Sequence, residues 1–172
     1  KTMLAGLVPS PDGKHFAYGT SEGGSDWSVW HVRTLPDGRE LGDAIRWVKF
    51  SGLSWTKDGK GFFYGRYPEP KGDALREAVH DKRIYYHVVG TSQSADKLVY
   101  QRAEEPDLFI NAGLDESYRY LFLVTNKGTS NKNELFVKDL GDPLAPKMDA
   151  PIVPLYPGHT AGYDPLGVVS GT

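Results

Sequence analysis

The sequence contains no cysteine among its 172 residues. A disulfide scaffold and a thiolate metal site are therefore excluded. The chain also lacks a strong excess of charge of either sign, because its net charge is −2 and its pI is about 6.2. This balance provides neither a basic surface for nucleic acid nor an acidic tail.

Long apolar runs and recognised catalytic patterns are missing as well. We expect no membrane span and no signal peptide in these residues. We expect a cytoplasmic location, and the absence of cysteine leaves the periplasm open. There is no Gly-x-Ser-x-Gly elbow, His-Glu-x-x-His pair, Walker loop or dinucleotide fingerprint. The five histidines are scattered along the chain. The residues therefore predict no catalytic triad, no metal site and no cofactor.

The sequence does contain a repeated turn and strand. Residues 10–18 read Ser-Pro-Asp-Gly-Lys-His-Phe-Ala-Tyr, and residues 56–64 read Thr-Lys-Asp-Gly-Lys-Gly-Phe-Phe-Tyr. Aspartate can bond to its own backbone and glycine adopts positive φ, so the pair favours a turn into a strand. A third copy at 115–123 keeps a basic residue and an apolar strand but not the Asp-Gly pair. A strand repeat with a period of roughly 50 residues is typical of β-propeller blades.

The second half of each unit also repeats. Residues 27–33, 83–89 and 133–139 have the composition of half-buried strands, and turn residues follow each of them. His31 and His87 occupy equivalent positions, which indicates structural strand residues rather than metal ligands. We predict an all-β fold, a partial β-propeller of about three blades of four-stranded antiparallel sheet and the start of a further blade. Its single domain, 1–172, divides into approximate units 1–45, 46–103, 104–150 and an incomplete 151–172.

Three blades are too few for a closed ring, which takes roughly four to eight. An edge strand and the faces of the terminal blades are therefore expected to lie open. Whether such a piece associates with a second copy of itself stays open at this point. The longest polar insertion, 68–82, contains proline, glycine and charged residues and is predicted as a surface loop.

Four stretches carry a more specific resemblance. They read Ser-Glu-Gly-Gly-Ser-Asp-Trp at 21–27, Trp-Val-Lys-Phe-Ser-Gly at 47–52, Trp-Thr-Lys-Asp-Gly-Lys-Gly-Phe-Phe-Tyr at 55–64 and Tyr-Tyr-His-Val-Val-Gly-Thr at 85–91. In this order, over nearly the whole chain, they resemble the prolyl oligopeptidase (prolyl endopeptidase) family of serine peptidases. In that family a seven-bladed propeller caps an α/β-hydrolase domain, and the pair hydrolyses short peptides on the C-terminal side of proline. The resemblance implies that this chain is an interior part of the propeller, without the catalytic domain, and inactive by itself.

The resemblance also implies site residues. Phe50 matches a phenylalanine that projects into the substrate cavity and contacts the substrate upstream of proline, and Phe109 lies where relatives place another apolar contact. Asn126 and Thr129 lie where some relatives carry an arginine and a cysteine that face the cavity, so polar substrate contacts there are not carried over. Asp26 falls where the propeller faces the catalytic domain.

The implied partners are a short proline-containing peptide and the α/β-hydrolase domain of the parent protein, with no nucleic acid and no membrane. The insertion at 68–82 matches a mobile loop near the interdomain opening. Two alternatives are kept. One is a non-enzymatic propeller that binds a protein or peptide. The other is a relative of the acylaminoacyl or dipeptidyl peptidases, against which the stretches 24–27 and 47–52 argue.

Overall fold

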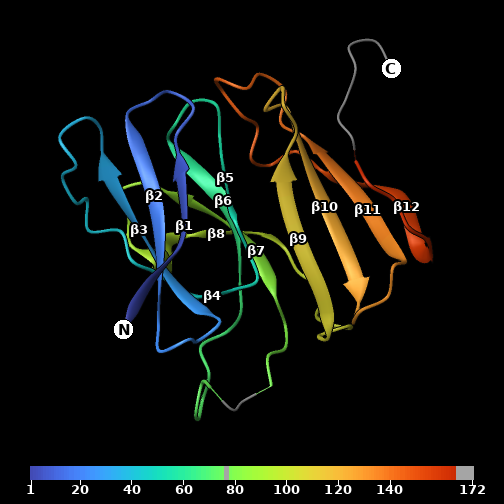
Figure 1. Ribbon diagram of the computed structural model, residues 1–172. Helices are drawn as coiled ribbons and strands as arrows, with labels where there is room; N and C mark the ends of the chain where they lie inside the picture. Colours follow the sequence, from blue (N-terminus) through green and yellow to red (C-terminus); the bar gives the residue numbers. More distant parts are fainter. Residues whose placement is uncertain (76–77, 166–172) are drawn as a thin grey trace.

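The computed structural model describes residues 1–75 and 78–165. Its strands form three four-stranded antiparallel sheets, each built from four consecutive strands. Figure 1 shows the sheets one after another, the first at the left, the second in the middle and the third at the right, without closing a ring. The predicted all-β, partial-propeller architecture is confirmed, and the described ranges contain no α-helix.

The first sheet contains β1 (Thr2–Pro9), β2 (His15–Glu22), β3 (Trp27–Thr34) and β4 (Ile45–Lys49). The second contains β5 (Leu53–Trp55), β6 (Gly61–Arg66), β7 (Arg83–Val88) and β8 (Lys97–Tyr100), with a short 3-10 helix η1 (Gln93–Ala95) before β8. The third contains β9 (Leu108–Leu114), β10 (Tyr120–Lys127), β11 (Asn133–Asp139) and β12 (Ile152–Ala161).

The end of the chain differs from the expected division into units. Residues 151–172 were expected to open a further unit, but β12 pairs with β11 and is the outer strand of the third sheet. In the sequence, the prolines of the connection between β11 and β12 suggest a boundary between two units. In the structure this connection folds back toward the end of β11, where the Lys147 N–H donates to the carbonyl of buried Leu140 at 2.8 Å. β4 likewise crosses the expected boundary at residue 45. Residues 166–172 lie outside the described residues.

The repeated turn has the same hydrogen bonds in both Asp-Gly copies. In the first copy, the Ser10 hydroxyl donates to Asp12 Oδ1 at 2.6 Å, and that oxygen accepts from the Lys14 N–H at 3.1 Å. In the second copy, Thr56 donates to Asp58 at 2.6 Å in the same way. The following glycines have φ of 70° and 67°. Local side-chain chemistry therefore sets the chain reversal before β2 and β6.

The third copy is a turn of the same kind made by different residues. Here the Ser117 hydroxyl donates to Asp115 Oδ2 at 2.6 Å, and Ser117 Oγ accepts from the Arg119 N–H at 3.2 Å. The acid and the hydroxyl have exchanged positions. Tyr118, with φ of 60°, stands where the other copies have glycine. The hydrogen bonds preserve the turn although the Asp-Gly pair is gone.

Apolar side chains fill the two interfaces between neighbouring sheets. In the first sheet, Trp30 covers Gly6 and Gly19, and a Cβ added at either glycine would lie 2.7 Å from the indole ring. The first interface buries Ala17, Trp30, Val32, Ile45, Val48, Trp55, Phe62 and Tyr64. The second buries Phe63, Ile84, Tyr86, Leu108, Ile110, Leu121, Leu123 and Leu140.

Strands at the two ends of the stack keep large apolar side chains exposed. These residues are Met3, Leu4 and Leu7 in β1 and Val153, Leu155 and Tyr156 in β12. A propeller blade normally covers such side chains with a neighbouring blade. The exposed residues therefore mark the places where the three sheets lack neighbours.

A buried histidine joins the first two sheets. His87 in β7 lies between two carboxylates, with Nε2 2.8 Å from Asp43 Oδ1 and Nδ1 2.6 Å from Asp96 Oδ1. Asp43 also accepts from the Gly90 N–H at 2.7 Å, and Asp96 accepts from the Tyr64 hydroxyl at 2.5 Å. Burial disfavours the imidazolium, but the hydrogen bonds that the ring donates to both carboxylates outweigh this effect and raise the pKa of His87 to about 9.

Candidate functional site

Phe50 lies directly after β4, where the chain crosses from the first sheet to the second. Its backbone φ is 51°, in the left-handed region that residues other than glycine seldom adopt. The residue is 52% exposed, and its ring centroid is 5.9 Å from that of Phe109 at the start of β9. The two apolar residues predicted to line a cavity therefore form one aromatic pair.

Asp26 is linked to this pair through a lysine. Lys49 Nζ lies 3.4 Å from Asp26 Oδ2, 5.2 Å from the Phe50 ring centroid and 5.3 Å from the Trp27 ring centroid. These distances suit cation–π contacts. The Asp26 side chain is 59% exposed, so its carboxylate lies at the surface beside the aromatic pair.

Asn126 lies near the end of β10, and Thr129 lies in the turn that follows this strand. Asn126 stands directly opposite Phe109 in the β9–β10 ladder, so the two side chains share one side of the sheet. Its Nδ2 donates to the Lys132 carbonyl at 3.5 Å. Thr129 is exposed in the turn after β10. The structure thus brings Asp26, Phe50 and Phe109 together, sets Asn126 beside them and leaves Thr129 at a loop tip.

A buried lysine completes the site, and the sequence did not predict it. Lys82 is 1% exposed, and its Nζ donates to the Phe50 carbonyl at 2.7 Å and to Asn111 Oδ1 at 3.1 Å. The same atom lies 4.6 Å from the Phe109 ring centroid. Burial lowers the pKa of Lys82 to about 8. In sequence it is the last residue of a polar loop, where no signal distinguishes it from an exposed lysine.

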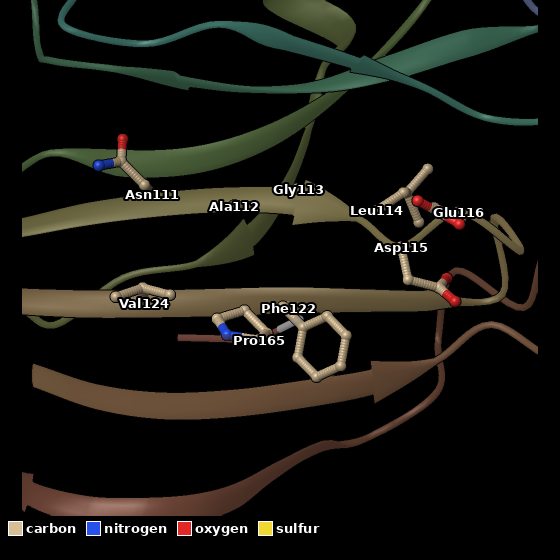
Figure 2. Close-up of a pocket in the computed structure, with 9 residues that line it drawn as sticks. All are labelled: Asn111, Ala112, Gly113, Leu114, Asp115, Glu116, Phe122, Val124 and Pro165. Carbon is tan, nitrogen blue, oxygen red and sulfur yellow. The ribbon is translucent and has the colours of Figure 1, made fainter. Parts of the chain in front are cut away.

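A shallow groove of about 320 Å³ runs along the third sheet next to this site. Figure 2 shows Phe122 and Val124 along the groove, Asn111 near one end, and Asp115 at the other. Asn111 accepts from Lys82 and Asp115 accepts from its own turn, and Glu116 is a third polar side chain of the lining. The groove therefore extends the apolar surface beside Phe109 and presents the carboxylates of Asp115 and Glu116 at one end.

One cluster in the third sheet combines a hydroxyl, an imidazole and a carboxylate. Thr125 Oγ1 lies 3.2 Å from His159 Nε2, and His159 Nδ1 lies 3.6 Å from Glu134 Oε1. Thr125 is fully buried, however, and its hydroxyl donates to Glu134 Oε2 at 2.9 Å. A nucleophile needs access to substrate and a base to take its proton. The cluster therefore ties β12 to the sheet and is not a catalytic triad.

Within residues 1–75 and 78–165, no group of His, Asp and Glu side chains is arranged to hold a metal ion. Across the same ranges, no helix has the length and apolar character needed to cross a membrane.

Comparisons with known proteins agree with this fold. Residues 1–164 match the family described as prolyl oligopeptidase, N-terminal beta-propeller domain. Prolyl oligopeptidase A of Amanita bisporigera is 45% identical over 147 residues, which are 75% of this chain and 19% of that protein. The chain therefore spans about a fifth of the length of this curated relative.

Solved structures give the same result. A structure from a study of two prolyl endopeptidases and their inter-domain dynamics has a TM-score of 0.85 and 30% identity, over 98% of this chain and 23% of that one. Prolyl oligopeptidase B of Galerina marginata, bound to a 35mer hydrolysis and macrocyclization substrate, has a TM-score of 0.83 and 34% identity. The match covers 95% of this chain and 24% of that one. The chain belongs to the prolyl oligopeptidase family, and residues 1–164 correspond to its N-terminal β-propeller domain.

Proposed function

We propose that this chain is the propeller segment of a prolyl endopeptidase, a serine peptidase that hydrolyses short peptides on the C-terminal side of proline. In this proposal the propeller gates and lines the substrate cavity. An α/β-hydrolase domain of the parent protein supplies the serine nucleophile and histidine base for acyl transfer. The chain itself contributes apolar surface and water exclusion, which strengthen the electrostatics of a neighbouring catalytic site.

The observation that carries the proposal is the exposed Phe50 ring paired with Phe109. A half-exposed phenylalanine on a left-handed backbone is costly to maintain and is suited to contact with another molecule. Similarity to prolyl oligopeptidase B, solved with a peptide substrate, supports a peptide as that molecule. Asp26 is proposed to contact the catalytic domain, because its carboxylate is exposed beside the pair.

The test uses an end-capped tetrapeptide with an apolar residue upstream of proline. Binding to the purified chain is followed by NMR chemical-shift changes of the Phe50 and Phe109 rings. We expect Phe50→Ala to weaken binding roughly tenfold, since about half a phenylalanine side chain of apolar contact is lost. Leu144→Ala removes a comparably exposed side chain from the β11–β12 connection and is expected to leave binding unchanged.

Two results would contradict the proposal. Equal binding by Phe50→Ala and the unmodified chain would remove the cavity role of Phe50. Cleavage of a proline-linked chromogenic peptide by the purified 172-residue chain would show that the chemistry does not need a separate hydrolase domain. Equal binding of peptides with and without proline would instead favour the non-enzymatic peptide-binding module.

Self-association is tested separately. A molecular mass that rises with protein concentration in light scattering would reveal pairing of the open sheets between two copies.

A further inference from the structure

Lys82 carries a buried positive charge without a carboxylate partner. Across the described ranges no Asp or Glu oxygen lies within ion-pairing distance of its Nζ, which is hydrogen-bonded to the Phe50 carbonyl and the Asn111 amide oxygen. Burying an ammonium against neutral acceptors is unfavourable, and this burial is what lowers the pKa of Lys82 to about 8. An apolar residue at this position would avoid the cost of burying a charge. We therefore look for a role that requires the ammonium itself.

The contacts of Lys82 converge on the aromatic pair. Its ammonium holds the carbonyl of Phe50, the residue with the left-handed φ of 51°, and lies 4.6 Å from the ring centroid of Phe109. A left-handed backbone costs about 1–2 kcal/mol in a residue with a side chain, so a specific contact must maintain it. The Lys82 ammonium therefore restrains both the backbone of Phe50 and the ring of Phe109.

The stem of Lys82 is held as closely as its charge. A Cβ added at Gly65 in β6 would lie 2.8 Å from Lys82 Cε and 3.1 Å from Ser51 Oγ. Ser51 Oγ in turn accepts from the Gly65 N–H at 2.9 Å, which anchors the residue after Phe50 to the same strand. The Lys82 stem therefore packs directly against the backbone of Gly65 in the second sheet.

Several ionisable groups surround Lys82. On its own segment, Asp81 pairs with Arg83, and His80 contacts Asp107, which precedes β9. At the end of β6, the ring centroid of Tyr67 lies 5.9 Å from Nζ, and burial raises the pKa of that phenol. Beyond the Phe50 ring, Lys49 is paired with Asp26, and β9 presents the neutral amide of Asn111. Each of these carboxylates thus has a partner other than Lys82.

We propose that Lys82 is the positioning residue of the Phe50–Phe109 pair, and that the pair keeps its peptide-binding arrangement only while Lys82 is protonated. A neutral amine makes weaker hydrogen bonds than an ammonium and has no cation–π attraction to Phe109. Peptide affinity therefore decreases roughly fivefold between pH 6.5 and pH 9.5. This inference rests on the proposed function for its peptide readout, but not for the position of the Phe50 ring.

The first experiment follows the free chain by NMR. The ¹³Cε resonance of Lys82, the Phe50 carbonyl resonance and the ring-to-ring NOE between Phe50 and Phe109 are recorded from pH 6 to pH 10. We expect the carbonyl shift and the NOE to change with the same midpoint as Lys82. A Phe50 carbonyl and NOE that stay constant while Lys82 titrates would overturn the inference.

The second experiment compares two buried lysines. Lys82→Met is expected to weaken the NOE at every pH and to abolish its pH dependence. Lys138→Met removes another buried lysine, which lies in β11 and donates to the Ala150 carbonyl of the β11–β12 connection, and is expected to leave the pair unchanged. Equal NOEs in Lys82→Met and the unmodified chain would refute the positioning role. If Lys82→Met does not fold, the titration of the unmodified chain decides.

Peptide binding separates the two proposals. Loss of affinity above pH 8 in the unmodified chain, together with the change in the NOE, supports both. A pH-dependent NOE with no peptide binding at any pH supports Lys82 as the positioning residue and refutes the proposed peptide contact. Peptide binding that is constant from pH 6.5 to pH 9.5 refutes the control of the site by Lys82 and leaves the proposed function intact.

Discussion

The buried Asp43–His87–Asp96 network predicts a loss of stability at mildly alkaline pH. Its histidine has an ordinary pKa of 6.5, raised to about 9 in the folded chain. Each pKa unit corresponds to about 1.4 kcal/mol, so the difference is worth about 3 kcal/mol of folding free energy. Because the folded state binds this proton more tightly, the contribution is complete below pH 6.5 and is lost as the pH rises through about 9.

Lys82 acts with the opposite sign in an overlapping range. Its folded pKa of about 8 lies below the ordinary value of 10.5, so deprotonation stabilises the folded chain as the pH rises between these values. The test must therefore compare variants at each pH and not rely on the unmodified chain alone. His87→Gln removes the imidazolium while keeping Lys82, so the difference between the two proteins isolates the histidine.

The assay is urea unfolding followed by tryptophan fluorescence at pH 6 and pH 9.5. We expect His87→Gln to cost about 3 kcal/mol more at pH 6 than at pH 9.5. His31→Gln, at the equivalent position of the first sheet, loses a contact with the Asp43 backbone carbonyl but keeps both carboxylates that hold His87, so it should retain the alkaline decrease. Parallel pH dependence in His87→Gln and the unmodified chain would refute the reasoning. If the variant does not fold, direct NMR titration of His87 gives the answer.

Two further predictions concern packing and charge. Gly61→Ala should lower the free energy of unfolding by at least about 2 kcal/mol, because the added Cβ would lie 2.1 Å from the His87 carbonyl oxygen. Gly113→Ala is the control, since a Cβ there would meet open space, and urea unfolding should show almost no change in its stability. Arg102→Gln should cost about 2–3 kcal/mol, since buried Glu134 loses its guanidinium partner and keeps only its contacts with Thr125, Gly158 and His159. Arg119→Gln breaks an exposed pair and should leave the urea midpoint almost unchanged, and equal shifts for the two arginine variants would contradict this reasoning.

Features that depend on nearby residues were predictable. The Asp-Gly turns could be identified because a carboxylate bonds to a backbone N–H two residues away, as Asp12 does with Lys14. Strand positions followed from alternation, and the number of four-stranded sheets followed from the repeat. The partner of β12 was not predictable in this way, since its prolines and apolar residues are equally compatible with the outer strand of one blade or the first strand of the next.

The candidate site was predictable only in part. Phe50 and Phe109 were identified by resemblance, and their contact depends on two sheets meeting. Tyr118 shows the limit of pattern reading, because it adopts the turn conformation that glycine has in the other copies. A sequence pattern records residue types, whereas the turn is maintained by hydrogen bonds that either Asp or Ser can make.

The sequence by itself determined the all-β repeat, the reversals between strands and the family. These follow from contacts over a few residues and from ordered motifs. Only the tertiary structure decided that Lys82 and His87 are buried charges at the junctions between sheets. Lys82 meets Phe50 and Asn111, which lie 32 and 29 residues away, and His87 meets Asp43 across 44 residues. Burial and ionisation are properties of that packing, because a charge is perturbed by whichever groups surround it in space.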